Sequence, residues 1–256
     1  MLFWRVLTAV VLAPVVLGAI FLGGPEITAA VLLAVAAAAY EVSRALLLPF
    51  PAALGAGVLP VLLSIPYGTN GILVGTFLSL PWALVWLATM GEARTLRSML
   101  ALLLMALWVG APLSHLGVTA ALPDGWLLVT VAVVGPWISD ASAYFSGRLF
   151  GRCKLFPSMS PNKTLEGAAG GLLLTSTVVA PFAYASLGFT PARAVFLGVV
   201  VSVFSQAGDL FESVLKRILE LKDLGRLLPG HGGILDRIDS LLFTAPAVYY
   251  LYTLIP

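Results

Sequence analysis

The stretch MLFWRVLTAVVLAPVVLGAIFLGG, Met1 to Gly24, indicates the class of the protein. Its apolar run is long enough to cross about 30 Å of hydrocarbon. The run is long for the apolar core of a signal peptide and no A-x-A-like site follows it, so we expect a retained first membrane span. The chain of 256 residues is 60% hydrophobic and 10% charged, whereas soluble domains carry about 25% charged residues. The sequence therefore predicts a polytopic integral membrane protein.

Apolar runs of similar length recur along the chain, and we expect an all-α fold with about nine transmembrane helices. The predicted spans are residues 4–22, 27–48, 51–67, 72–90, 98–121, 126–147, 165–187, 191–215 and 239–255. The third span is short and interrupted by proline. The eighth is long, and its polar C-terminal half is expected to project beyond the bilayer.

The positions of the basic residues predict the orientation, because cytoplasmic loops carry an excess of Lys and Arg. With these spans, all of the 14 Lys and Arg except Arg193 fall on the side of the N-terminus. We therefore predict an N-in, C-out topology in the cell membrane. The longest segments between spans, 147–164 and 219–237, then face the cytoplasm.

Composition excludes several kinds of site. Cys153 is the only cysteine, so the chain has no intrachain disulfide and no cysteine metal cluster. There is no histidine pair for zinc and no GxxxxGK[ST] loop for an ATPase. A net charge of +2 is too small to argue for nucleic acid as a partner.

Charges within apolar helices are informative, because each costs roughly 2.5–3.5 kcal/mol at the bilayer centre. In SDASAYFSGRLFGR, the residues Asp140, Tyr144 and Arg148 share one helix face. In SMSPNKTLEGAAGG, we expect a helix to start at Ser160–Pro161, because a hydroxyl residue precedes proline. A helix N-terminus with Lys163 and Thr164 would suit a phosphate, and the glycines that follow suit close helix packing.

Two further polar clusters lie near the C-terminus. In SQAGDLFESVLKRILELKD, one polar stripe is formed by Asp209, Glu212, Ser213, Lys216 and Glu220. In LPGHGGILDRIDS, the residues Asp236 and Asp239 flank Arg237, and the glycines before them predict a tight turn. Oxygen ligands of this type suit Mg²⁺. Carboxylates, basic residues and glycine turns on the cytoplasmic side together indicate metal-assisted phosphoryl or nucleotidyl transfer.

The same residues carry a family resemblance. SVLKRILELKDLGRLLPGHGGILDRIDS resembles the signature of the phosphatidate cytidylyltransferases, which reads S-x-x-K-R, then K-D, then P-G-H-G-G-x-x-D-R-x-D. The two upstream stretches, around Asp140 and Lys163, are similar to further motifs of that family. The resemblance is strong over residues 137–243, and in the N-terminal half it rests on hydropathy alone. It implies that CTP and phosphatidic acid are joined into CDP-diacylglycerol with release of pyrophosphate.

The resemblance also implies partners and roles. It implies Mg²⁺, with a second cation as an option, a membrane lipid substrate and a homodimer, and it implies metal-ligand roles for Asp209 and Asp236, with Asp239 adjoining them. We assign catalysis to Asp209, Asp236, Asp239, Lys216 and Arg237, and phosphate binding to Ser160, Asn162, Lys163, Lys216, Arg217, His231 and Arg237. Residues 1–122 are expected to frame the lipid entrance, and residues 123–256 to form the catalytic region.

Structural roles remain open for several residues. Asp140 has Arg148 as a candidate ion-pair partner, and Glu212 either binds metal or pairs with Lys216. Glu166 either caps a helix or faces the cavity, and His231 shapes the turn or contacts substrate. Lys222 and Arg226 also fit a role as membrane-interface anchors.

Two other functions compete with the first. One is a cytidylyltransferase or kinase that acts on another lipid phosphate or a polyprenyl alcohol, which a substrate panel with labelled CTP would reveal. The other is an ion or solute transporter, because intramembrane carboxylates also line ion pathways. Liposome flux that depends on Asp140 or Asp209 without nucleotide turnover would favour a transporter.

Overall fold

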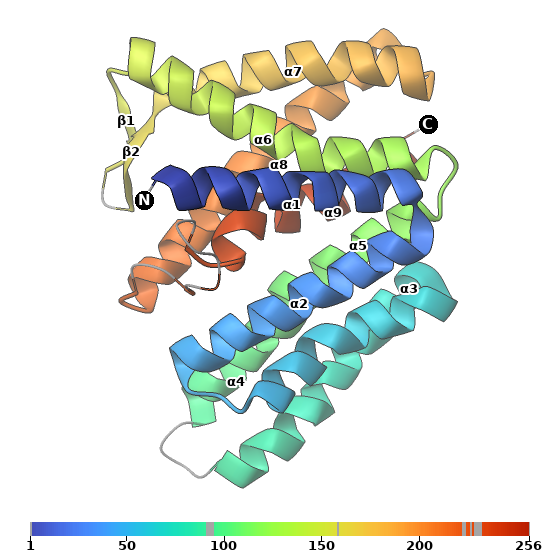
Figure 1. Cartoon of the computed structure of the whole chain (residues 1–256), viewed down its shortest axis with the longest axis vertical. Coiled ribbons are helices and arrows are strands. Elements are labelled where there is room, and N and C mark those ends of the chain that lie inside the picture. The colour runs from blue at the N-terminus through green and yellow to red at the C-terminus, as the bar shows by residue number, and fades with distance from the viewer. Residues whose placement is uncertain are drawn as a thin grey trace. The chain divides into compact units, whose positions relative to one another are not determined.

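The computed structural model describes residues 2–90, 95–157, 159–221, 224–225, 227 and 232–255. Its regular structure is helical apart from one short β-hairpin (Figure 1). Six of the described helices are long and apolar enough to cross a membrane. The prediction of an all-α, multi-pass membrane protein is thereby confirmed, while the number of spans and the N-in, C-out orientation stay predictions.

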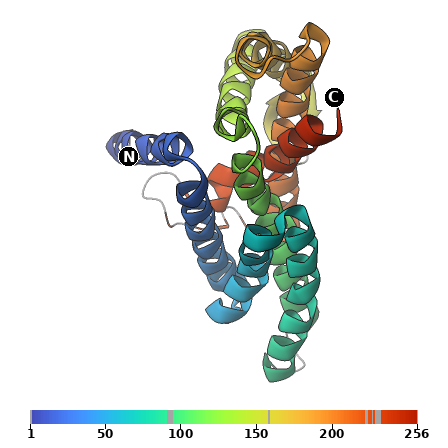
Figure 2. The same ribbon diagram turned by 90° about the vertical axis from the view of Figure 1, so that its right-hand side faces the viewer.

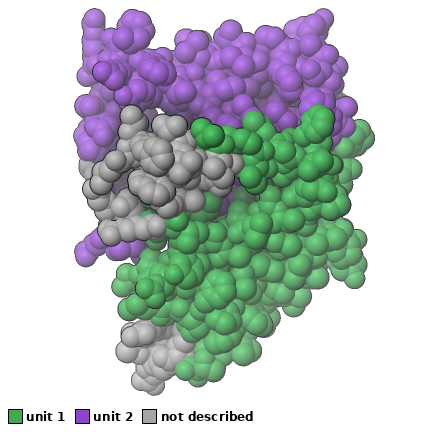
Figure 3. Space-filling view, viewed as in Figure 1, with its two compact units in different colours: residues 1–123, 223–237 green, residues 124–222, 238–256 purple. Residues whose placement is uncertain are grey.

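The chain divides into two compact units, coloured separately in Figure 3. The first comprises residues 1–123 and 223–237, and the second comprises residues 124–222 and 238–256. Before residue 124 the elements are α1 Leu2–Leu22, α2 Gly24–Leu46, α3 Phe50–Met90, α4 Thr95–Leu104, the π-helical turn η2 Met105–Gly110 and α5 Ala111–Ala120. After it come α6 Gly125–Phe150, β1 Lys154–Phe156, β2 Ser160–Thr164, α7 Leu165–Leu187, α8 Pro191–Ile218 and α9 Leu235–Leu254.

In the first unit, α3 is a helical hairpin rather than one straight helix. Gly68 interrupts it with φ 58° and ψ −136°, a conformation that glycine adopts at little cost. The two halves are joined by side chains, because Ser79 Oγ donates to Ala56 O at 2.9 Å and Trp82 Nε1 donates to Ala52 O at 3.0 Å. The halves therefore correspond to the separate predicted spans 51–67 and 72–90.

Small residues allow the helices of the first unit to approach closely. Helix α2 lies against α3 and α5, as both ribbon views show (Figure 1, Figure 2). Its buried face includes Val35, Ala38 and Ala39. A Cβ on Gly110, at the end of η2, would overlap the carbonyl oxygen of Gly57 on α3, so the π-helical turn lies in backbone contact with the hairpin.

In the second unit, α6 packs along α7, and α7 packs along α8. Polar side chains bridge these helices. The buried hydroxyls of Ser139 and Ser202 are 3.2 Å apart, and Nε2 of the half-buried Gln206 donates to Ala168 O at 3.2 Å. A Cβ on Gly170 would overlap Ser146 of α6. The glycines after Lys163 therefore do serve close helix packing.

The expected helix start at Ser160–Pro161 is wrong. Residues Ser160–Thr164 form β2, which pairs antiparallel with β1, and α7 begins at Leu165. Thr164 is extended (φ −121°, ψ 154°), and its Oγ1 accepts the amide of Gly167 at 3.1 Å as an N-cap. A serine followed by a proline was a misleading signal here, because proline is equally suited to an edge strand.

The end of the polar stripe also differs from expectation. Helix α8 ends at Ile218, and Glu220 has a left-handed φ of 56° beyond it. Glu220 therefore does not continue the helical face that carries Asp209 and Lys216. The start of α8 follows the capping rules, with Thr190 Oγ1 accepting the amide of Arg193 at 3.3 Å.

The hairpin of α3 should not tolerate a side chain at Gly75. A Cβ there would lie 2.5 Å from Pro60 Cα, which is backbone and cannot rotate away. We expect Gly75→Ala to lower the free energy of unfolding by about 1–3 kcal/mol through overpacking, measured by thermal unfolding in detergent. Gly18→Ala is the matched control, because nothing lies within 4 Å of a Cβ at Gly18. Equal stability of the two variants would contradict the hairpin packing.

Candidate functional site

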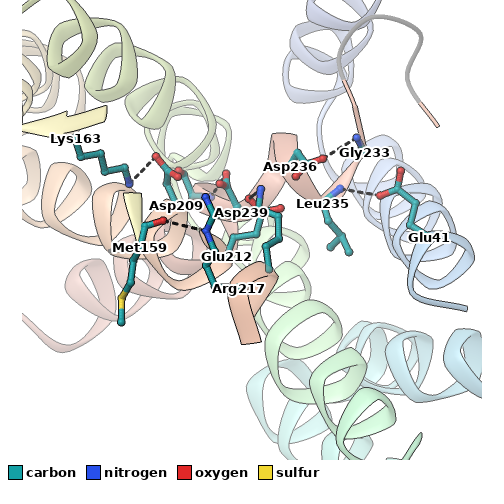
Figure 4. A network of polar contacts seen from close by, with 12 residues as sticks. Glu41, Met159, Lys163, Asp209, Glu212, Arg217, Gly233, Leu235, Asp236 and Asp239 are labelled. Atoms are coloured by element: carbon teal, nitrogen blue, oxygen red, sulfur yellow. Dashed lines mark hydrogen bonds and ion pairs between the residues drawn. The ribbon is translucent and has the colours of Figure 1, made fainter. Parts of the chain in front are cut away.

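Three acidic residues of the second unit gather where α8 meets α9, and we call Asp209, Glu212 and Asp239 the carboxylate cluster (Figure 4). Glu212 is 2% exposed and Asp239 is 8% exposed, whereas the Asp209 side chain is 36% exposed. The Asp239 carboxylate lies beside the Glu212 side chain and is repelled by the charge of Asp209. The carboxylate cluster thus concentrates negative charge at a partly buried position between α8 and α9.

The two helices meet there because α8 has a glycine at the crossing. A Cβ on Gly208 would lie 2.5 Å from the carbonyl oxygen of Asp239. Next to it, Asp239 Oδ1 accepts the amide of Ser240 at 2.6 Å. The backbone contact and this local hydrogen bond hold the Asp239 carboxylate beside α8.

Basic residues accompany the cluster. Lys163 Nζ lies 2.8 Å from Asp209 Oδ2 (Figure 4). Lys216 Nζ lies 3.0 Å from Glu212 Oε2. The structure thus brings Lys163, Asp209, Lys216 and Asp239 together from three different elements. The predicted pairing of Glu212 with Lys216 is present, although the pairing itself does not exclude a metal role for Glu212.

The β-hairpin carries Lys163 to the cluster. Arg217 Nε donates to Met159 O at 3.5 Å, a contact between α8 and the turn that precedes β2. Glu166 accepts the amide of Cys153 at 3.1 and 3.2 Å through its two carboxylate oxygens. Glu166 therefore ties the start of α7 to the residues before β1. The cap of α7 is Thr164 rather than Glu166, and a role of Glu166 toward the cavity stays a prediction.

The remaining phosphate-binding candidates are less defined. Ser160 is half-buried and Asn162 is exposed on β2, and Arg237 is exposed on α9. Their roles stay predictions. Lys222, Asp223, Arg226, Pro229, Gly230 and His231 lie outside the described residues.

In the first unit, Asp236 has a defined local geometry at the start of α9. Its Oδ2 accepts the amide of Gly233 at 2.8 Å (Figure 4). Gly232 has a φ of 82°, as a glycine turn requires. The predicted turn is thus present in its described part. The metal role of Asp236 stays a prediction.

One buried acid was missed by the sequence analysis. Glu41 lies on α2, is 2% exposed, and accepts backbone amides from Leu227, Ile234 and Leu235. The available signal was a single carboxylate within an apolar run, which costs roughly 2.5–3.5 kcal/mol at the centre of a bilayer. Nothing near Glu41 in the sequence indicates its partners, because all three lie beyond residue 220.

The carboxylates of the cluster are oxygen ligands of the kind that could hold Mg²⁺. Among the described residues, no group of three or more His, Cys, Asp and Glu is arranged to hold a metal by itself. Mg²⁺ is commonly bound by one or two carboxylates, with waters and phosphate oxygens as the other ligands. The adjacent carboxylates of Asp209 and Asp239 fit that mode of binding. They do not resemble a structural metal site, in which protein side chains supply all of the ligands.

Comparisons with known proteins agree with this chemistry. The model of the cytidylyltransferase family matches residues 3–255. A phosphatidate cytidylyltransferase of Bacillus subtilis (strain 168) is 45% identical over 131 residues, which are 51% of this chain and 49% of the relative.

Two staphylococcal proteins of the same name are similar. That of Staphylococcus haemolyticus (strain JCSC1435) is 42% identical over 129 residues, and that of Staphylococcus aureus (strain COL) is 43% identical over 130 residues. In both cases the match covers 50% of each chain. The chain thus matches about half the length of these curated relatives. Since the family pattern itself extends over residues 3–255, the chain belongs to the cytidylyltransferase family.

Proposed function

We propose that the protein is a phosphatidate cytidylyltransferase, which converts CTP and phosphatidic acid into CDP-diacylglycerol and pyrophosphate. The observation that carries the proposal is the carboxylate cluster with Lys163 and Lys216 beside it, in a membrane protein of this family. The names of the similar bacterial proteins supply the substrate class.

The reaction fits the residues at the cluster. A phosphomonoester has a second pKa near 6, so its oxygen is already anionic at pH 7 and needs no general base. That oxygen attacks the α-phosphorus of CTP, a new P–O bond forms, and the bond to the β-phosphate oxygen breaks. The electron pair leaves with pyrophosphate. The protein's main task is to offset the negative charge of two phosphate groups that must approach each other.

We assign the residues accordingly. Lys163, Lys216, Arg217 and Arg237 bind phosphate oxygens, and Ser160, Asn162 and His231 make weaker polar contacts. Asp209 and Asp239 hold Mg²⁺, and Asp236, one helical turn before Asp239 on α9, is a further ligand. The bound ion supplies positive charge to the phosphate oxygens.

The location and assembly belong to the same proposal. Phosphatidic acid arrives from the bilayer and CTP arrives from water, so a reaction centre at the level of the inner leaflet suits both. We propose that the centre faces the cytoplasm of the cell membrane. We also propose that the protein works as a homodimer, as the resemblance to its family implies.

The direct test is turnover by the purified protein. With Mg²⁺, CTP and phosphatidic acid in mixed micelles, we expect release of pyrophosphate and formation of CDP-diacylglycerol, both abolished by EDTA and restored by added Mg²⁺. A panel of an ether-lipid phosphate and a polyprenyl alcohol decides between substrate classes. Turnover confined to one of these alternatives would replace phosphatidic acid, and no turnover with any of them would overturn the proposal.

A second test concerns Asp236. We expect Asp236→Asn to reduce turnover by at least about 10²-fold, because a negatively charged ligand is lost, while the amide oxygen can still accept the Gly233 N–H. Thermal unfolding should therefore stay close to wild type. Asp124→Asn is the matched control, since Asp124 is exposed and Asn tolerates its φ of 58°. Near-normal turnover of Asp236→Asn would remove Asp236 from the site.

A further inference from the structure

We propose that Glu41 is a positioning residue for the segment that begins α9, and through it for the Asp236 carboxylate. This inference rests on the proposed function, because it gives Glu41 a part in the same reaction. Glu41 belongs to α2, a helix of the N-terminal half that carries none of the signature residues. All of its contacts described below lie within the first unit.

The contacts of Glu41 are with backbone amides. Its Oε1 accepts the amide of Ile234 at 2.9 Å and that of Leu227 at 3.3 Å. Its Oε2 accepts the amide of Leu235 at 3.2 Å (Figure 4). The first amides of a helix have no partner within the helix and form the positive end of its dipole. At the start of α9, the buried carboxylate of Glu41 accepts hydrogen bonds from these amides and places negative charge at the positive end of the helix dipole.

The same carboxylate accounts for two glycines of the signature stretch. A Cβ on Gly225 would overlap Cδ of Glu41, and a Cβ on Gly233 would lie 2.7 Å from Oε2. Neither glycine has a positive φ. The close approach of Glu41 is therefore the steric reason for glycine at these two positions.

Glu41 and Asp236 share the ordering of one short run of backbone. The amide of Gly233 donates to Asp236 Oδ2 at 2.8 Å, and the next two amides donate to Glu41. The three consecutive amides 233–235 are thus all bound by carboxylates. Because the Gly233 amide that binds Asp236 belongs to the same run of backbone, we expect loss of Glu41 to loosen the orientation of Asp236.

The experiment compares Glu41→Ala and Glu41→Gln with wild type in the full-length protein. Ser43→Ala is the matched control, because Ser43 is also buried on α2 but its hydroxyl bonds Ala39 O of its own helix. Hydrogen exchange is measured without substrate on the peptide that contains Ile234 and Leu235. Turnover is measured as kcat and as KM for CTP.

We expect exchange of the Ile234 and Leu235 amides in Glu41→Ala to be faster by on the order of tenfold or more, because each loses a hydrogen bond to a charged group. Exchange in α3 should not change. We expect kcat to fall on the order of 10–100-fold, since small misplacements of reacting groups are costly, with a smaller effect on KM. Glu41→Gln retains one acceptor oxygen and should be intermediate, and Ser43→Ala should match wild type.

These measurements distinguish a positioning role of Glu41 from a general effect on protein stability. They also distinguish failure of this inference from failure of the proposed function. Unchanged exchange at Ile234 and Leu235 in Glu41→Ala would overturn the inference, and so would faster exchange spread equally over α3, or faster exchange with unchanged kcat. If wild type shows no turnover, the proposed function fails, while the exchange data still decide whether Glu41 orders this segment.

A steric double mutant tests the contact independently of turnover. Gly225→Ala should accelerate exchange of the same peptide in wild type, because the new methyl group displaces Glu41. Adding Gly225→Ala to Glu41→Ala should have little further effect, since the obstructing side chain is gone. Additive effects would mean that Glu41 does not lie against Gly225, and they would overturn the inference.

Discussion

A charge that leaves water for a largely apolar protein must be matched by an opposite charge or by hydrogen bonds, and the arrangement of this molecule depends on that constraint. Glu212 meets it with Lys216 on the same helix. Asp209 meets it with Lys163, which arrives on a β-hairpin. Glu41 meets it with backbone amides. The second and third solutions each join segments that are distant in sequence, so the need to neutralise charge also organises the chain.

Asp239 satisfies the constraint less completely than the others. It is almost buried, and the carboxylate of Asp209 is among its neighbours. Two carboxylates in a medium of low dielectric raise each other's free energy. Added positive charge would relieve this repulsion, which is the physical argument behind the proposed cation at the cluster. The same neighbours would be a poor choice if the only purpose were stability.

Hydropathy predicted most of the helices, because a span of given length must be apolar whatever it packs against. The turn at Gly68 was implied by the break between two such runs. The start of α7 was misplaced, because Ser160–Pro161 fits an edge strand as well as a helix start. The Glu212–Lys216 pair follows from helical spacing. The approach of Lys163 to Asp209 is a tertiary contact. The sequence patterns named each of these two residues separately, but no local pattern predicts that they pair. Glu41 was invisible, since a lone acid gives no sign of partners elsewhere in the chain.

The separation in sequence between Glu41 and its partners limits how early during synthesis their contacts can form. The contacts of Glu41 span 186 to 194 residues of chain, so they close only after most of the polypeptide has left the ribosome. The closure of a longer loop costs more conformational entropy, although this cost grows only slowly with loop length. The amides ahead of Asp236 therefore cannot be ordered by Glu41 until residues 227–235 have been synthesised, and a chain that stalls before that point lacks these contacts.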